Sequence, residues 1–253
     1  MMASTIPKAR IAFFDFTCCE GCQLAVADAL QTHLDLLEAV EIVNFREVMS
    51  EKSDDYMIAF VEGSCTRMSD EARLKVIREN AQILVALGAC AHIGGVNAIR
   101  TGLDIAGVRR YVYGEKAMFF ETDSARPIDA VVPVDAYIPG CPIDLDEFVR
   151  TVKALLLGRI PILHDYPVCV ECKMKENVCL YTIDKTCLGP ITRAGCGAIC
   201  PTFGVGCEGC RGLISNPNIR SLKEVFSENG FDEKTLMEKM KIFLSYQTME
   251  SES

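Results

Sequence analysis

Cysteine is the residue type whose number and spacing suggest chemistry in this sequence. Fourteen of the 253 residues are Cys, whereas His occurs three times and Trp is absent. Eight of the cysteines fall between residues 169 and 210, and the other six precede residue 142. Thiols in such numbers serve as disulfides, as zinc ligands or as ligands of iron–sulfur clusters.

Disulfides require an oxidising compartment, and therefore a leader that directs export. Lys8 and Arg10 precede an apolar run, but Asp15 interrupts that run too early for a signal peptide. The single Arg-Arg pair, Arg109-Arg110, lies deep in the chain, so no twin-arginine signal is visible. No stretch reaches the ~18 apolar residues that would span a bilayer. We therefore expect a cytoplasmic protein without a membrane span, whose reduced thiols bind metal.

The overall charge argues against a nucleic-acid partner. The chain carries 26 basic and 35 acidic residues, for a formal net charge of −9, and its pI is near 5.0. Binding to a phosphate backbone needs a basic stripe or patch, and the sequence has none. With 49% apolar and 24% charged residues, the composition is that of an ordinary globular protein.

Apolar periodicity indicates the elements that must position the thiols. Over residues 9–158, strand-like runs alternate with segments whose apolar residues have helical spacing. This alternation predicts an α/β fold with a doubly wound parallel sheet. Helical spacing begins near Gln23 and continues to Leu37, a second helix starts at Ser69, and a third follows Asp144. The strand-like runs are residues 9–16, 40–48, 56–61, 83–87 and 130–138.

The early cysteines follow these strands. Carboxyl ends of parallel strands meet at one edge of a sheet, where such folds bind ligands. Four thiolates hold a [4Fe–4S] cluster, and the best set has a Cys-x2-Cys pair and one cysteine after each of two later strands. We call this set, Cys19, Cys22, Cys90 and Cys141, the sheet-edge quartet. Cys18 and Cys65 are left over, and burial as small apolar residues is the simplest role for Cys65.

The later cysteines divide into two further sets. The 169–187 quartet is Cys169, Cys172, Cys179 and Cys187, and the 196–210 quartet is Cys196, Cys200, Cys207 and Cys210. The segment that holds them is rich in Gly and Pro and poor in periodicity, so ligation would supply its folding free energy. Zinc also accepts four cysteines. Three cluster-sized sets in one acidic chain favour an iron–sulfur relay, with zinc sites in a non-redox interaction module as the alternative.

These observations predict three parts. Residues 1–160 form the α/β domain with one cluster, residues 161–215 form an irregular cysteine-rich domain with two, and residues 216–253 form C-terminal helices.

The motifs resemble a known family. CCEGC after the first strand, VEGSC, LGAC followed by AHIGG, and PGCP are similar to the small subunit of [NiFe] hydrogenases, to which the cluster-bearing subunit of respiratory complex I is related. The later stretch CLGPITRAGCGAICPTFGVGCEGCRG resembles the small subunit of soluble, multimeric, bidirectional hydrogenases, including sulfhydrogenases and NAD-linked and electron-bifurcating enzymes.

The resemblance implies a flavodoxin-like domain and three [4Fe–4S] clusters. The sheet-edge quartet would bind the proximal cluster, the 196–210 quartet the medial one and the 169–187 quartet the distal one. Because many relatives have proline near the Cys200 position and bind a [3Fe–4S] cluster, cysteine here implies [4Fe–4S]. Complex I uses adjacent cysteines as ligands, which leaves the Cys18-Cys19 pair as another possibility for the proximal site.

The resemblance also implies the partners. The Ni–Fe centre would lie on a separate large subunit, and this chain would pass electrons between it and flavin- or iron–sulfur-containing subunits, during H2 oxidation or evolution. Glu62, in VEGSC, resembles a family glutamate beside the proximal cluster with a role in orientation or proton movement. This chain alone is not expected to be catalytic. A complex I-like oxidoreductase subunit is the other reading within the family.

Overall fold

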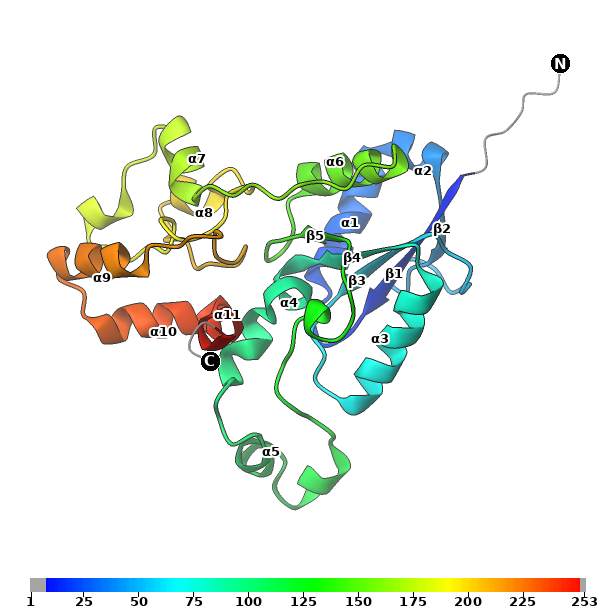
Figure 1. Ribbon diagram of the computed structural model, residues 1–253, viewed down its shortest axis with the longest axis horizontal. Helices are drawn as coiled ribbons and strands as arrows, with labels where there is room; N and C mark the ends of the chain where they lie inside the picture. Colours follow the sequence, from blue (N-terminus) through cyan, green and yellow to red (C-terminus); the bar gives the residue numbers. More distant parts are fainter. Residues whose placement is uncertain (1–7, 251–253) are drawn as a thin grey trace.

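The computed structural model describes residues 8–250 and contains one parallel β-sheet (Figure 1). Its five strands are arranged in the order β2-β1-β3-β4-β5. This is the order of flavodoxin-like doubly wound sheets, so the predicted fold class is confirmed. The strands are β1 (Ala9–Asp15), β2 (Val40–Asn44), β3 (Ile58–Glu62), β4 (Ile83–Leu87) and β5 (Ala136–Ile138).

Helices cover both faces of the sheet (Figure 1). On one face lie α1 (Gly21–Thr32), α2 (Leu34–Ala39) and α6 (Leu145–Leu156). On the other lie α3 (Met68–Asn80) and, at the end of β4, α4 (Gly88–Ile93). The helix predicted after Asp144 is confirmed as α6, and the Asp144 side chain caps it by accepting a hydrogen bond from the Glu147 N–H.

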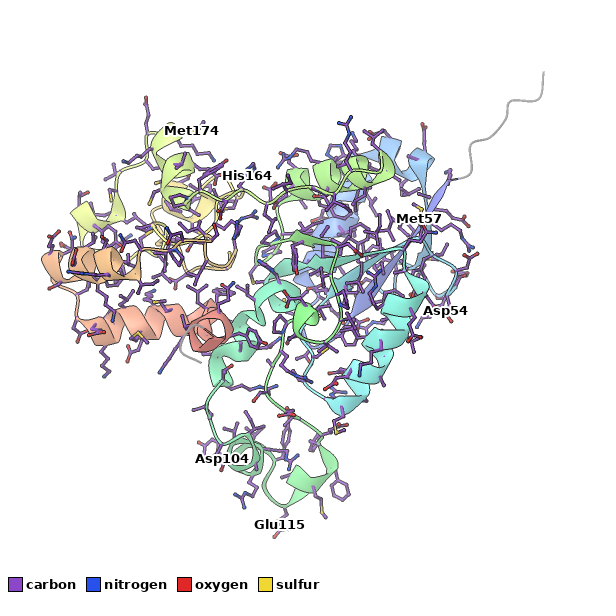
Figure 2. All side chains as sticks on the ribbon, in the orientation of Figure 1. Asp54, Met57, Asp104, Glu115, His164 and Met174 are labelled. Carbon is purple, nitrogen blue, oxygen red and sulfur yellow. The ribbon has the colours of Figure 1, made fainter. Side chains whose placement is uncertain are left out.

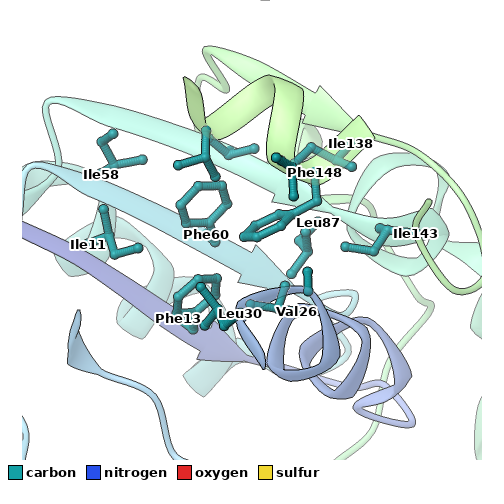
Figure 3. Packing of buried hydrophobic residues seen from close by; sticks show 14 of the residues in the cluster. Ile11, Phe13, Val26, Leu30, Ile58, Phe60, Leu87, Ile138, Ile143 and Phe148 are labelled. Carbon is teal, nitrogen blue, oxygen red and sulfur yellow. The ribbon is translucent and has the colours of Figure 1, made fainter. Parts of the chain in front are cut away.

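The two cores follow from the period-2 pattern of the strands. Ile11 and Phe13 point to the α1/α6 face, whereas Ala12 and Phe14 point to the α3 face. Figure 3 shows the first of these cores, in which the Phe13 and Phe60 rings stack at 5.0 Å and Phe148 of α6 packs against both. Burying one such ring contributes roughly 1.5–3 kcal/mol. Apolar packing therefore fixes the strands whose ends carry cysteines.

Three predicted boundaries were wrong. The second strand ends at Asn44 rather than residue 48, because the chain turns after Phe45. The helix predicted to run through Leu37 is two helices, which meet at His33. The last strand begins at Ala136, since a short 3-10 helix, η3 (Ile128–Ala130), occupies the start of the predicted run. Some apolar residues outside the strands, such as Met49 and Ile128, also pack on the core, so periodicity alone could not place the ends.

The cysteine-rich segment forms a second lobe beside the sheet (Figure 1). An extended connection containing His164 leads from α6 to this lobe (Figures 1 and 2). The lobe holds only short helices before residue 212, namely α7 (Val168–Met174), η4 (Leu180–Ile183) and α8 (Ile199–Thr202). The irregular character predicted for this segment is confirmed. The proposed three-part division of the chain remains a prediction.

Helices α9 (Ile219–Glu228), α10 (Glu233–Phe243) and α11 (Ser245–Glu250) close the described chain. Asn218 caps α9 and Asp232 caps α10. Their buried residues pack with Leu188 and Ile191 of the cysteine-rich segment and with Ile93 of α4. One apolar cluster thus joins the two lobes.

An arm that the sequence analysis did not anticipate projects from the sheet domain. It contains α5 (Ile105–Tyr113) and η2 (Gly114–Phe119), and Asp104 and Glu115 mark it in Figure 2. The 3-10 helix η1 (Gly95–Arg100), which packs against α4 and α10, leads into it. In the part of the chain that the structure describes, no helix combines the length and the apolar character needed to cross a bilayer.

Candidate iron–sulfur sites

The carboxyl ends of the parallel strands bring the sheet-edge quartet together. Cys19 precedes α1 and Cys22 lies in its first turn, whereas Cys90 follows β4 and Cys141 follows β5. Cys19 and Cys22 each interact electrostatically with Cys90 and Cys141, and Cys90 interacts with Cys141. Residues separated by more than a hundred positions are therefore neighbours, as strand order requires.

Glycine makes room for the sulfurs of this quartet. A Cβ atom on Gly88 would overlap Cys22 Sγ, and one on Gly95 would lie 2.9 Å from Cys90 Sγ. Both glycines have a positive φ, of 83° and 55° respectively. Backbone approaches the thiols closely at these two points because no side chain stands between them.

Glu62 lies at the centre of this edge. It is the last residue of β3 and is only 2% exposed. Its Oε1 accepts a hydrogen bond from the Cys22 N–H at 3.2 Å, and its Oε2 accepts one from the Gln23 N–H at 2.9 Å. Burial raises the pKa of Glu62, while these two N–H groups act in the opposite direction. A carboxylate from a neighbouring strand thus caps the helix that carries Cys22.

The two leftover cysteines lie in different surroundings. Cys18 is half-buried and interacts with Cys90 and Cys19, so it borders the sheet-edge quartet. Cys65 is fully buried in the apolar cluster of the α3 face, and its backbone pairs with Arg126. Its position matches the role of a small apolar residue that the sequence analysis preferred.

The 169–187 quartet lines one small cavity in the second lobe. Cys169 interacts with the other three cysteines, and Cys187 interacts with Cys172 and Cys179. A Cβ atom on Gly189 would lie 3.3 Å from Cys187 Sγ and 3.4 Å from Cys169 Sγ. Cys187 Sγ accepts two hydrogen bonds, from the Gly189 N–H at 3.4 Å and from the Cys207 N–H at 3.3 Å. Such N–H···S contacts are typical of bound thiolates.

The 196–210 quartet lines a second cavity, and Cys141 of the sheet-edge quartet lines the same one. Cys200 interacts with Cys196, and Cys210 interacts with both and with Cys141. Cys207 interacts with Cys210 and also with Cys187. The 196–210 quartet therefore contacts both of the others.

The thiols fit a cationic group. Burial raises the pKa of Cys90, Cys169 and Cys210 to about 12, one cysteine from each quartet. Buried thiols of this kind are deprotonated when they bind a metal, and the positive charge of the metal compensates for the burial of the thiolates. Within residues 8–250, no group of three or more His, Cys, Asp or Glu side chains is arranged to hold a single metal ion. All-cysteine donors and close backbone fit the soft, bulky iron–sulfur group.

Sequence reasoning missed a cavity of about 480 Å³ at the base of the projecting arm. Thr17 and Thr66, which follow β1 and β3, line it together with Arg67, Arg100 and Arg109. Two of these arginines already donate to backbone carbonyls, Arg100 to Asp123 and Arg109 to Phe120. No motif marks this cavity, because its residues come from four separate segments.

Comparison with known proteins identifies the family. The family model described as the 20 kDa subunit of NADH–ubiquinone oxidoreductase matches residues 19–155, which is more than half of the chain. The chain belongs to this family. A curated relative, the sulfhydrogenase 2 subunit delta of Pyrococcus furiosus, is 37% identical over 221 residues, which cover 87% of this chain and 92% of the relative.

Two further comparisons agree with it. A subunit of the vhu F420-non-reducing hydrogenase of Methanococcus voltae is 31% identical, over 81% of this chain and 82% of the relative. A chain of the crystal structure of an NAD+-reducing [NiFe]-hydrogenase in the H2-reduced state superposes with a TM-score of 0.55 at 29% identity, covering 62% of this chain and 95% of that chain. The resemblance to hydrogenase small subunits is thus confirmed.

Proposed function

We propose that this chain is the electron-transfer subunit of a multimeric [NiFe] hydrogenase, an oxidoreductase acting on H2, and that it binds three [4Fe–4S] clusters. The observation that carries the proposal is the gathering of twelve cysteines into three neighbouring quartets in a chain of this family. Relatives named as hydrogenase subunits support the reaction.

The residues that would hold the clusters are the three quartets. When bound, each cluster accepts and releases one electron at a time, at a potential set by its surroundings. The chain contributes those surroundings. Glycines 88, 95 and 189 let the backbone approach the sulfurs, N–H groups donate to Cys187, and apolar residues such as Val168 and Leu180 keep water away.

The order of the sites is proposed from the contacts between quartets. Cys141 meets Cys210, and Cys207 meets Cys187, so the 196–210 quartet lies between the other two. This arrangement supports the spatial order proximal, medial, distal that the resemblance to hydrogenase small subunits implies. An electron entering at the sheet edge would leave at the 169–187 quartet, or travel in the reverse direction.

Exposure supports the placement of the partners. Cys19 and Cys141 are exposed, so the sheet edge is open to a large subunit that carries the Ni–Fe centre. At the far end Cys179 is exposed, and Met174 and Val178 beside it are exposed apolar residues suited to a flavin- or iron–sulfur-containing subunit. Figure 2 marks Met174 at the outer edge of the second lobe. We place the complex in the cytoplasm.

Glu62 is proposed to orient the proximal site rather than to react. Its two carboxylate oxygens are both engaged by the N–H groups of α1. It therefore fixes the first turn of α1, which carries Cys22 and begins two residues after Cys19.

Anaerobic purification of the native complex tests the proposal. We expect a brown preparation with about twelve irons for each copy of this chain, four per cubane, and a nickel-containing large subunit. Cys141→Ser should abolish H2-dependent dye reduction and leave the EPR signals of the other two sites. A colourless chain with stoichiometric zinc would instead identify an interaction module. Hydrogen oxidation at normal rates in Cys141→Ser would contradict the assignment of the sheet-edge quartet.

A further inference from the structure

Arg211 is a charged side chain buried between the two lobes. It is 1% exposed and is the largest fully buried side chain among residues 8–250. Its Nη1 and Nη2 donate to the two carboxylate oxygens of Glu147 at 2.7 and 2.8 Å, so the pair is bidentate. Its Nε donates to the Ala194 carbonyl at 2.9 Å, and Nη1 also donates to the Pro139 carbonyl at 2.9 Å.

These partners connect two cysteine sites. Arg211 directly follows Cys210, Pro139 lies two residues before Cys141, and Ala194 lies two residues before Cys196. One guanidinium group therefore holds the backbone beside one ligand of the sheet-edge quartet and beside two ligands of the 196–210 quartet. Its ion-pair partner belongs to α6, which is packed on the sheet.

The chain around the guanidinium leaves space for it. Gly195 has a φ of 121°, and a Cβ atom there would overlap Nη2 of Arg211. Glycine at the position directly before Cys196 thus allows the arginine to approach that ligand. Arg211 also interacts electrostatically with both Cys196 and Cys210.

The two sites meet beside this ion pair. The backbone N–H of Cys141 interacts with the Cys210 thiol, and both side chains line the same cavity. Since Cys141 and Cys210 belong to different quartets, this contact is a direct link through the protein between the two sites.

We propose that Arg211 is a positioning residue: with Glu147 it fixes the Cys141–Cys210 contact through which electrons pass between the sheet-edge and 196–210 sites, and its charge sets the potential of the latter. The inference rests on the proposed function, since it requires clusters at both quartets. An arginine suits the role because it stays protonated and its planar fork holds several acceptors at once. In a buried site, its charge is weakly screened.

Opposite charge changes provide the test. Arg211→Met leaves the Glu147 carboxylate without its cation, whereas Glu147→Gln leaves the guanidinium without its anion. Arg211→Lys keeps the positive charge but loses the planar guanidinium group that bonds several acceptors at once. Arg193→Met is the matched control, because Arg193 is also mostly buried and also pairs with a carboxylate, that of Asp165. Its other hydrogen bonds go to the carbonyls of His164 and Leu213, and none of these bonds connects two cysteine quartets. All four are made in the complete hydrogenase complex and studied without oxygen.

EPR-monitored redox titration supplies the readouts. We expect the midpoint potential of the 196–210 site to fall in Arg211→Met and to rise in Glu147→Gln, each by about tenfold in the equilibrium constant, which is about 59 mV for one electron. Arg211→Lys should stay within threefold of the wild type in potential but show weaker spin coupling between the reduced sheet-edge and 196–210 sites. Arg193→Met should change neither quantity.

Shifts of the same sign in Arg211→Met and Glu147→Gln, or potentials and coupling indistinguishable from Arg193→Met, would overturn the proposal. If Arg211→Met does not retain iron, the rise in Glu147→Gln and the weakened coupling in Arg211→Lys decide the matter. Failure of the proposed function would look different, because the wild-type complex itself would then lack signals from the two sites.

Discussion

The hydrogen bonds of Glu62 allow a quantitative prediction about the sheet edge. Its carboxylate accepts from two buried N–H groups, those of Cys22 and Gln23. Helix α1 has no other side-chain cap, since the Glu20 side chain at its N-cap makes no such bond. Replacing Glu62 with Ala removes both acceptors and leaves two buried donors unpaired.

The expected cost follows from these donors. A buried donor without a partner costs about 1–3 kcal/mol. Burial raises the pKa of Glu62, so removing the carboxylate also relieves some desolvation. We therefore expect Glu62→Ala to lower the free energy of local opening at the start of α1 by about 2–4 kcal/mol. Glu62→Gln keeps one acceptor and should cost about half as much, roughly 1–2 kcal/mol.

Hydrogen–deuterium exchange of the anaerobic complex measures this opening directly. Since each 1.4 kcal/mol is a factor of ten, exchange at the Cys22 and Gln23 amides should accelerate about 30- to 1000-fold in Glu62→Ala and about 5- to 30-fold in Glu62→Gln. Glu121 provides a matched control, because this exposed carboxylate accepts from the Met68 N–H at 2.9 Å at the start of α3. Water can replace it, so Glu121→Ala should change exchange at Met68 by no more than about twofold.

Two results would refute the reasoning. One is exchange at Cys22 and Gln23 that rises less than threefold in Glu62→Ala. The other is an equal effect in Glu121→Ala at Met68, because that would make burial of the acceptor irrelevant.

Three further substitutions, one of them a control, test the sites through iron content. Gly88→Ala and Gly102→Ala share the backbone strain of a positive φ, 83° and 84°, worth about 1–2 kcal/mol, but only the Gly88 Cβ would meet a sulfur, that of Cys22. Gly88→Ala should therefore lose about four irons per chain while Gly102→Ala loses none; equal iron contents by elemental analysis would contradict the steric argument. Cys65→Ala should keep all the iron and lower stability by about 1 kcal/mol, because Cys65 packs in an apolar cluster; loss of one cluster's iron in that variant would make Cys65 a ligand.

Much of the sheet domain could be predicted from the sequence because its signals are local. The wholly apolar run ILVAL forms β4 at Ile83–Leu87, as predicted, and Asp144 caps α6. The projecting arm was not predicted, although Ile105, Val108 and Val112 of α5 recur at helical spacing, because α5 has no buried residue and contributes none to the sheet cores. The turn after Phe45 was missed for a different reason, because the strand-like residues Val48 and Met49 follow Arg46 and Glu47 without continuing the strand.

The amino-acid sequence by itself determined that thiols would gather at one sheet edge, because a parallel sheet places the carboxyl ends of its strands together whatever the details of packing. It also determined the spacing of the later cysteines. Only the tertiary structure decided how Glu62 caps a helix some 40 residues away in sequence and how Arg211 reaches the Pro139 carbonyl across 72 residues. Spacing along the chain encodes periodicity and turns, whereas hydrogen bonds between distant segments exist only once packing has brought those segments together.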